Sequence, residues 1–158
     1  MKLSLIGVGA VMALRLLLFQ MGRPPVGTEF MLVHFLALAT IVFFVGQAML
    51  ARDARSSFPH LVREGFKSAA VYALIYGIFI LVYYRVVEPE HFAARVNAMV
   101  ERGIEQGQPE AVIRPRMEQF FTPFNYASMT FFALLAVSGF NALTIGLLHH
   151  KVLRRFKR

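Results

Sequence analysis

Residues 30–50 read FMLVHFLALATIVFFVGQAML, a run with no Asp, Glu, Lys or Arg. A helix needs about 20 mainly apolar residues to cross the hydrocarbon of a bilayer. Comparable apolar runs cover about 3–21, 68–84 and 124–148. We therefore predict an all-α integral membrane protein, a four-helix bundle in which residues 1–158 form a single membrane domain.

The composition agrees with this fold class. Hydrophobic residues make up 57% of the 158 residues and charged residues only 16%. A soluble domain of this length has about a quarter of its residues charged. The chain has no cysteine, which excludes disulfides, thiolate metal sites and cysteine nucleophiles. The first run contains Arg15 and lacks a small-residue cleavage site, so we expect an uncleaved helix rather than a signal peptide.

The charges are distributed unevenly between the apolar runs. If the N-terminus is cytoplasmic, the inner segments hold ten Lys and Arg residues against two acids, and the outer segments six against seven. Lys and Arg are enriched on the cytoplasmic side of membrane proteins, so both termini are expected in the cytoplasm. The inner basic residues are Lys2, Arg52, Arg55, Arg63, Lys67, Lys151, Arg154, Arg155, Lys157 and Arg158.

The basic tail, residues 149–158, ends with four closely spaced cations: Arg154, Arg155, Lys157 and Arg158. Such clusters next to a membrane helix attract anionic lipid headgroups. We expect these residues to face lipid and to help fix the topology, and we expect no nucleic-acid partner.

The connection between the third and fourth runs is the only long one. Pro89 suits the first turn of a helix, and a second helix can start near Pro109. Glu110 and Arg114 are spaced i,i+4 on that second helix, and Pro115 should break or kink it. We predict an extracytoplasmic helical hairpin at about 89–121, between helices three and four. Thr122 and Pro123 then fit the cap and first turn of the fourth helix.

The inner segment 51–67 has two readings. Phe58, Leu61, Val62 and Phe66 can form the apolar side of a short amphipathic helix among lipid headgroups. Alternatively, the segment is a solvated linker that leads straight into the third helix.

Arg15 is the costliest residue of the apolar runs, because an arginine deep in a membrane usually faces the protein interior or water. His34 lies at a similar depth in the second run, and Gln20 and Glu29 lie nearer the outer end. The functional reading is an anion or proton site with Arg15 as the cation and His34 as the titratable group. The structural reading is a polar clamp between the first two helices.

Two stripes of small residues recur at four-residue spacing. Ala69, Ala73 and Gly77 lie in the third run, and Ser138, Ala142 and Gly146 in the fourth. Small residues let membrane helices approach closely, which predicts that these two helices pack together. Nearby Tyr72, Tyr76, Asn141 and Thr144 either hydrogen-bond between helices or line a small cavity.

No catalytic or metal-binding pattern is present. The chain has no H-E-x-x-H, P-loop, G-x-S-x-G or paired-acid arrangement. His149 and His150 are adjacent, so on a helix they point about 100° apart, and we interpret them as part of the basic tail. We expect no catalytic residues, no metal and no cofactor.

Several motifs together resemble a bacterial family of small membrane proteins, the domain of unknown function DUF4199. They are Phe58 followed by Arg63-Glu64-Gly65-Phe66-Lys67, Tyr83-Tyr84 at the end of the third run, Pro89, and Phe120-Phe121-Thr122-Pro123. The resemblance covers nearly the whole chain and implies four spans. It carries no activity and no catalytic residues over to this chain.

The function expected from the sequence is therefore that of a non-enzymatic accessory or scaffold subunit that engages lipid, another membrane protein or a second copy of itself. The alternative is a small transporter or channel component with an anion or proton site around Arg15 and His34.

Overall fold

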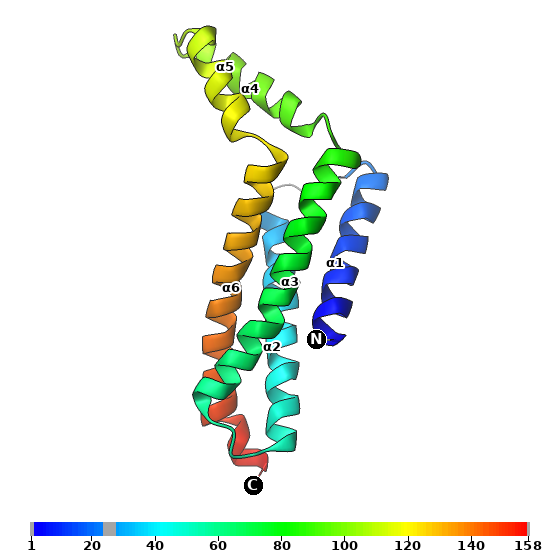
Figure 1. Cartoon of the computed structure of the whole chain (residues 1–158), viewed down its shortest axis with the longest axis vertical. Coiled ribbons are helices and arrows are strands. Elements are labelled where there is room, and N and C mark those ends of the chain that lie inside the picture. The colour runs from blue at the N-terminus through cyan, green and yellow to red at the C-terminus, as the bar shows by residue number, and fades with distance from the viewer. Residues whose placement is uncertain (1, 24–27, 158) are drawn as a thin grey trace. The chain divides into compact units, whose positions relative to one another are not determined.

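The computed structural model describes residues 2–23 and 28–157, apart from the side chains of residues 28–29 and 156–157. The protein is 87% helical, with no strand in the part of the chain so described (Figure 1). The elements are α1 (Lys2–Gln20), α2 (Thr28–Arg52), α3 (Phe58–Val86), α4 (His91–Glu105), α5 (Glu110–Phe120), α6 (Pro123–Lys151) and the 3₁₀ helix η1 (Leu153–Lys157). The proline-containing loop before α2 lies largely outside the described residues.

Four of these helices, α1, α2, α3 and α6, are long and apolar enough to cross a membrane. The predicted all-α class, with four helices able to span a membrane, is thus confirmed. Two bounds differ from the apolar runs. Helix α3 begins at Phe58 rather than near residue 68, so the ambiguous inner segment supplies its first turns. Helix α6 continues to Lys151, so the expected tail begins inside a helix.

The chain forms two compact units. The first unit comprises Met1–Tyr76 and Phe132–Arg158, and the second comprises Gly77–Phe131. Helices α3 and α6 contribute to both units.

The first unit has an apolar core from its four helices, with Val8 of α1, Leu38 and Ile41 of α2, and Leu134 of α6 all buried. Gly7 sets the contact between α1 and α2, since a Cβ added there would lie 3.0 Å from Cδ1 of Ile41. This contact fixes the register of the two helices.

The small-residue stripes lie where helices approach closely. Ala69, Ala73, Ser138 and Ala142 are completely buried in the first unit. A Cβ at Gly146 of α6 would come within 2.9 Å of Val62 on α3. In the second unit, a Cβ at Gly77 of α3 would lie 3.2 Å from Cβ of Phe131 on α6. Each glycine thus makes room for a side chain of the neighbouring helix.

The second unit contains α4 and α5, which pack on each other through a small core. Val96, Val100 and Ile113 are buried, and Met117 and Phe121 cover them. Gly103 lets Ile113 approach α4, and Gly107 makes the turn between the helices with a φ of +80°. Glycine adopts this left-handed conformation without the steric cost of a Cβ.

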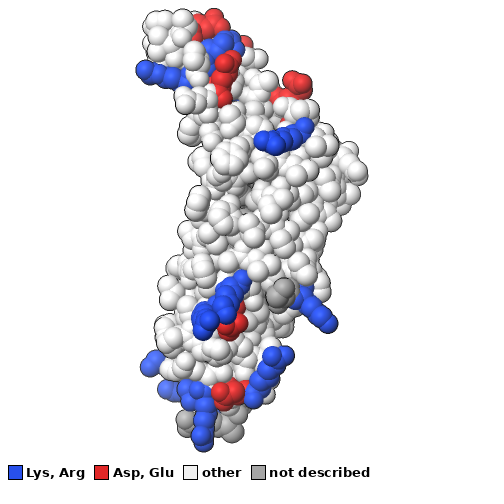
Figure 2. Space-filling model, viewed as in Figure 1, with Lys and Arg blue, Asp and Glu red and all other residues white. Residues whose placement is uncertain are grey.

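The second unit contains the ion pair and the helix cap that the sequence predicts. The Nη2 atom of Arg114 lies 2.7 Å from Oε1 of Glu110, and Nη1 donates a hydrogen bond to Oδ1 of Asn97 on α4. Pro115 lies inside α5 and does not end it. The Thr122 hydroxyl accepts a hydrogen bond from the Asn125 amide, which confirms the predicted cap of α6. In Figure 2, side chains of both signs gather over α4 and α5.

Candidate functional site

Arg15 is held inside the first unit by the periodicity of α1. The buried residues of this helix are Ser4, Val8, Val11 and Arg15, spaced so that they share one face. Only 4% of Arg15 is exposed. Its Nη1 atom donates a hydrogen bond to the hydroxyl oxygen of Tyr76 at 3.4 Å, and its Cζ atom lies 5.5 Å from the ring centre of Phe30. The cation therefore has both a hydrogen-bond acceptor and an aromatic ring as partners.

His34 is equally enclosed. It is 3% exposed, and its Nδ1 atom lies 2.7 Å from the hydroxyl oxygen of Tyr72 in a hydrogen bond. Its ring contacts Phe30 edge-on at a centroid distance of 5.1 Å and Tyr76 at 4.2 Å. Phe30 and Tyr76 thus contact both Arg15 and His34.

We call Arg15, His34, Tyr72 and Tyr76 the polar cluster. It joins α1, α2 and α3, and all four side chains are buried. The sequence predicted that Arg15 and His34 lie at one level, and the structure brings them to the same pair of aromatic rings. It does not add Gln20, which is exposed at the end of α1. The Glu29 side chain lies outside the described residues.

The tyrosines are the part of the cluster that the sequence predicts least directly. The sequence places Tyr72 and Tyr76 near the small-residue stripes, and only the transporter alternative joins Tyr76 to Arg15 and His34. The signal for them is their i,i+4 spacing on α3, which puts two hydroxyl groups on one face of that helix. The other polar residues near the stripes bond to main chain instead. The Ser138 hydroxyl donates to the Leu134 carbonyl, and Asn141 Nδ2 lies 3.5 Å from the Phe35 carbonyl.

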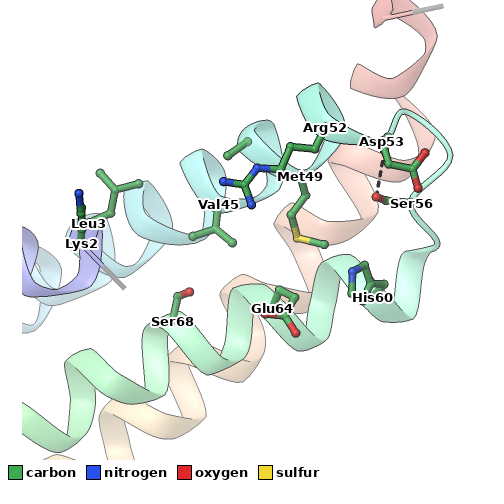
Figure 3. Close-up of a pocket in the computed structure, with 11 residues that line it drawn as sticks. Lys2, Leu3, Val45, Met49, Arg52, Asp53, Ser56, His60, Glu64 and Ser68 are labelled. Atoms are coloured by element: carbon green, nitrogen blue, oxygen red, sulfur yellow. Dashed lines mark hydrogen bonds between the residues drawn. The ribbon is translucent and has the colours of Figure 1, made fainter.

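A pocket of about 580 Å³ lies elsewhere in the first unit, between α1, α2 and the first turns of α3 (Figure 3). Lys2 and Leu3 line it from α1, and Val45, Met49 and Arg52 line it from α2. We call this cavity the first pocket. A small-molecule site typically occupies about 300–1,000 Å³, so its size suits a ligand.

Helix α3 supplies the polar wall of the first pocket. His60, Glu64 and Ser68 recur every four residues on α3 and all line the cavity. This stripe was not recognised in the sequence, because the segment before residue 68 was assigned to a linker or a short surface helix. The i,i+4,i+8 spacing is the signal that identifies it once the segment is known to be helical.

A second, smaller pocket of about 240 Å³ lies at the end of α6, and we call it the basic pocket. It is lined by His150, Lys151, Arg154 and Arg155. The Nη1 atom of Arg154 lies 3.4 Å from Nε2 of His150. Two of the four predicted lipid-facing cations therefore line one cavity, whereas the side chains of Lys157 and Arg158 lie outside the described residues.

His149 differs from the expectation that it belongs to the basic tail. It is fully buried, and its Nδ1 atom lies 2.8 Å from the Ile145 carbonyl. Its ring fills the space left by Gly46 of α2 and packs 5.1 Å from the ring of Phe43. The two histidines point about 100° apart on the helix, so one faces α2 and the other lines the basic pocket.

No group of three or more His, Cys, Asp or Glu side chains arranged to hold a metal ion occurs within the described ranges. The sequence patterns for covalent or metal-dependent catalysis are also missing. What the described side chains offer is hydrogen bonding in the polar cluster and charge in the two pockets.

Comparison with known proteins gives a family but no activity. No curated protein and no solved structure matches the chain. The family model described as "Protein of unknown function (DUF4199)" matches residues 2–151, which is nearly the whole chain. The protein thus belongs to the DUF4199 family, whose function is unknown.

Proposed function

We propose that this protein is a non-enzymatic accessory or scaffold subunit of a bacterial inner membrane, with both termini in the cytoplasm. It engages anionic lipid at its basic inner surface, and it binds a membrane-protein partner or a second copy of itself through its apolar helix faces. The observation that carries this proposal is the basic pocket, because its lining contains two arginines, a lysine and a histidine but no acid.

The position of the basic pocket favours lipid as its ligand. It lies at the C-terminal end of α6, whose exposed side chains include Phe140, Leu143 and Leu147. In a bilayer these side chains contact acyl chains, so the cations just beyond them lie at the level of the headgroups. A basic cluster there gains about 1 kcal/mol of binding free energy per Lys or Arg from anionic lipid.

The apolar faces provide the surface for a partner within the membrane. Large exposed side chains occur on every spanning helix; examples are Ile6 on α1, Leu32 on α2, Ile78 on α3 and Phe132 on α6. Lipid covers such faces where no partner helix does.

The transporter alternative depends on access to the polar cluster. It requires a water-filled cavity that joins Arg15, His34 and Tyr76. These side chains are buried, and neither the first pocket nor the basic pocket is lined by any of them. The burial favours the clamp reading, in which the polar groups hold α1, α2 and α3 together.

The test measures lipid binding by the purified protein in detergent. Dioleoyl phosphatidylglycerol is titrated into the protein, and the bound lipid is counted by native mass spectrometry. The Arg154→Gln/Arg155→Gln variant should bind about 25-fold more weakly at one site, since each arginine contributes about fivefold. Arg102→Gln, which removes an exposed arginine of α4, is the control and should bind as the parent does. Unchanged binding by the double variant would refute the lipid role of the basic pocket.

A further inference from the structure

We propose that the first pocket is a second lipid site, in which Lys2 and Arg52 bind the phosphate of a glycerophospholipid and the apolar wall of α1 and α2 receives the start of its acyl chains. The inference rests on the proposed function, because lipid is again the ligand. It places this second lipid in a separate cavity that is lined by different residues.

The pocket lies where the described start of α1 faces the last turns of α2 and the first turns of α3. Lys2 and Leu3 line it from α1, Arg52 from α2 and His60 from α3. Three helices therefore contribute to its walls.

The lining of the pocket has two cations, Lys2 and Arg52, and two acids, Asp53 and Glu64. Lys2 and Arg52 have no hydrogen bond or ion pair within residues 2–23 and 28–157. The two acids of the lining are already engaged. Oδ1 of Asp53 accepts a hydrogen bond from the Arg55 amide, and Oε1 of Glu64 lies 2.8 Å from Nζ of Lys67. Glu64 is thus paired with a cation and Asp53 with a main-chain amide, whereas Lys2 and Arg52 are available to an anionic ligand.

The close-up shows where the two cations lie along the pocket (Figure 3). In Figure 3 the guanidinium of Arg52 extends back along α2 toward Val45 and the end of α1 where Lys2 lies, while the carboxylate of Asp53 points away from it. Both residues line the pocket, so a phosphate inside it is attracted by both charges. Across the pocket, Ser68 of α3 offers a hydroxyl group for hydrogen bonds to the headgroup.

The apolar part of the lining favours a lipid over a water-soluble phosphate ester. Leu3, Val45, Ala48 and Met49 form one wall of the pocket. Leu3 is 42% exposed, and Leu5 and Ile6 next to it are more exposed still, so this wall leads to a helix surface suited to hydrocarbon. A soluble ester would leave the wall without an apolar partner, whereas an acyl chain covers it.

The experiment starts from the Arg154→Gln/Arg155→Gln protein, so that the basic pocket no longer contributes. Dioleoyl phosphatidylglycerol is titrated into this protein in detergent, and bound lipid is counted by native mass spectrometry. Lys2→Gln and Arg52→Gln should each weaken binding about fivefold, and the two together about 25-fold. Arg55→Gln removes an exposed arginine of the same segment outside the pocket and should leave binding unchanged.

A second pair of variants tests the cavity without changing charge. Ala48→Trp fills the pocket and should reduce binding at least tenfold, while Ala51→Trp, at an exposed position of α2 outside the lining, should not. The thermal midpoint of each variant is measured to confirm that it remains folded.

Three results would overturn the inference. Binding by the Lys2→Gln/Arg52→Gln variant at parental strength would exclude the two cations, and an Ala48→Trp variant with full affinity would exclude the cavity. Competition by sn-glycerol 3-phosphate at the concentration of the lipid would identify a soluble phosphate ester as the ligand. None of these results bears on the basic pocket, which is tested by comparing the parent with Arg154→Gln/Arg155→Gln.

Discussion

The Nδ1 atom of His34 on α2 lies 2.7 Å from the hydroxyl oxygen of Tyr72 on α3, and both side chains are almost completely buried. Thirty-eight residues of sequence separate them. This hydrogen bond and the one between Arg15 and Tyr76 join three spanning helices in the interior of the first unit. If the polar cluster holds these helices together, substitutions within it should lower the free energy of unfolding.

Tyr72→Phe removes the hydroxyl group and keeps the ring. The His34 Nδ1 atom then loses the hydrogen bond that it makes in the structure, and an unsatisfied buried polar atom costs about 1–3 kcal/mol. We expect the free energy of unfolding, measured by denaturant titration in detergent, to fall by that amount. Tyr126→Phe is the control, since Tyr126 is 37% exposed, and it should change the free energy by less than about 0.5 kcal/mol. Equal stability of Tyr72→Phe and the parent would show that the bond contributes nothing.

Arg15→Leu distinguishes the clamp from a functional site. The substitution removes the hydrogen bond to Tyr76 and the cation–π contact with Phe30, so the clamp predicts a loss of about 1–2 kcal/mol in the free energy of unfolding. Arg102→Leu at an exposed position of α4 serves as the control. A rise in thermal stability of Arg15→Leu would mean that the buried cation is retained for function, and the transporter alternative would then gain support.

Gly46→Ala tests the packing of His149. A Cβ at position 46 would lie 2.9 Å from three atoms of the His149 ring, too close for van der Waals contact. The buried ring has little room to move, so we expect a loss of about 1–3 kcal/mol in the free energy of unfolding.

Gly9→Ala on α1 is the matched control for Gly46→Ala, because a Cβ there would meet nothing within 4 Å. Alanine is a better helix former than glycine by about 1 kcal/mol, so Gly9→Ala should be neutral or slightly stabilising. If the two glycine variants had the same effect, the burial of His149 against α2 would be wrong.

The sequence predicted the four spanning helices well, because an apolar run of sufficient length has few other stable structures in a bilayer. It predicted helix ends less well. Hydropathy measures apolar content, and Arg63, Glu64 and Lys67 lower it although they lie on α3. The apolar run therefore begins about ten residues after the helix does, and the polar stripe of the first pocket was missed with it.

The candidate site was predicted only in part, for a physical reason. Depth along a helix follows from residue count, so Arg15 and His34 could be placed at one level. The rotation of each helix about its axis depends on packing, and the rotation of α3 brings Tyr72 and Tyr76 to Arg15 and His34. The same applies to His149, whose orientation toward Gly46 is set by the packing of α6 on α2.

The central claim, that the chain crosses a membrane four times, is tested most directly by cysteine labelling. The natural sequence has no cysteine, so single cysteines at positions 23, 57, 108 and 155 give one label site each. With a membrane-impermeant maleimide applied to intact bacterial cells, the account predicts labelling at 23 and 108. Labelling at 57 and 155 should appear only after the inner membrane is permeabilised. Positions 57 and 108 reacting alike in intact cells would contradict the account.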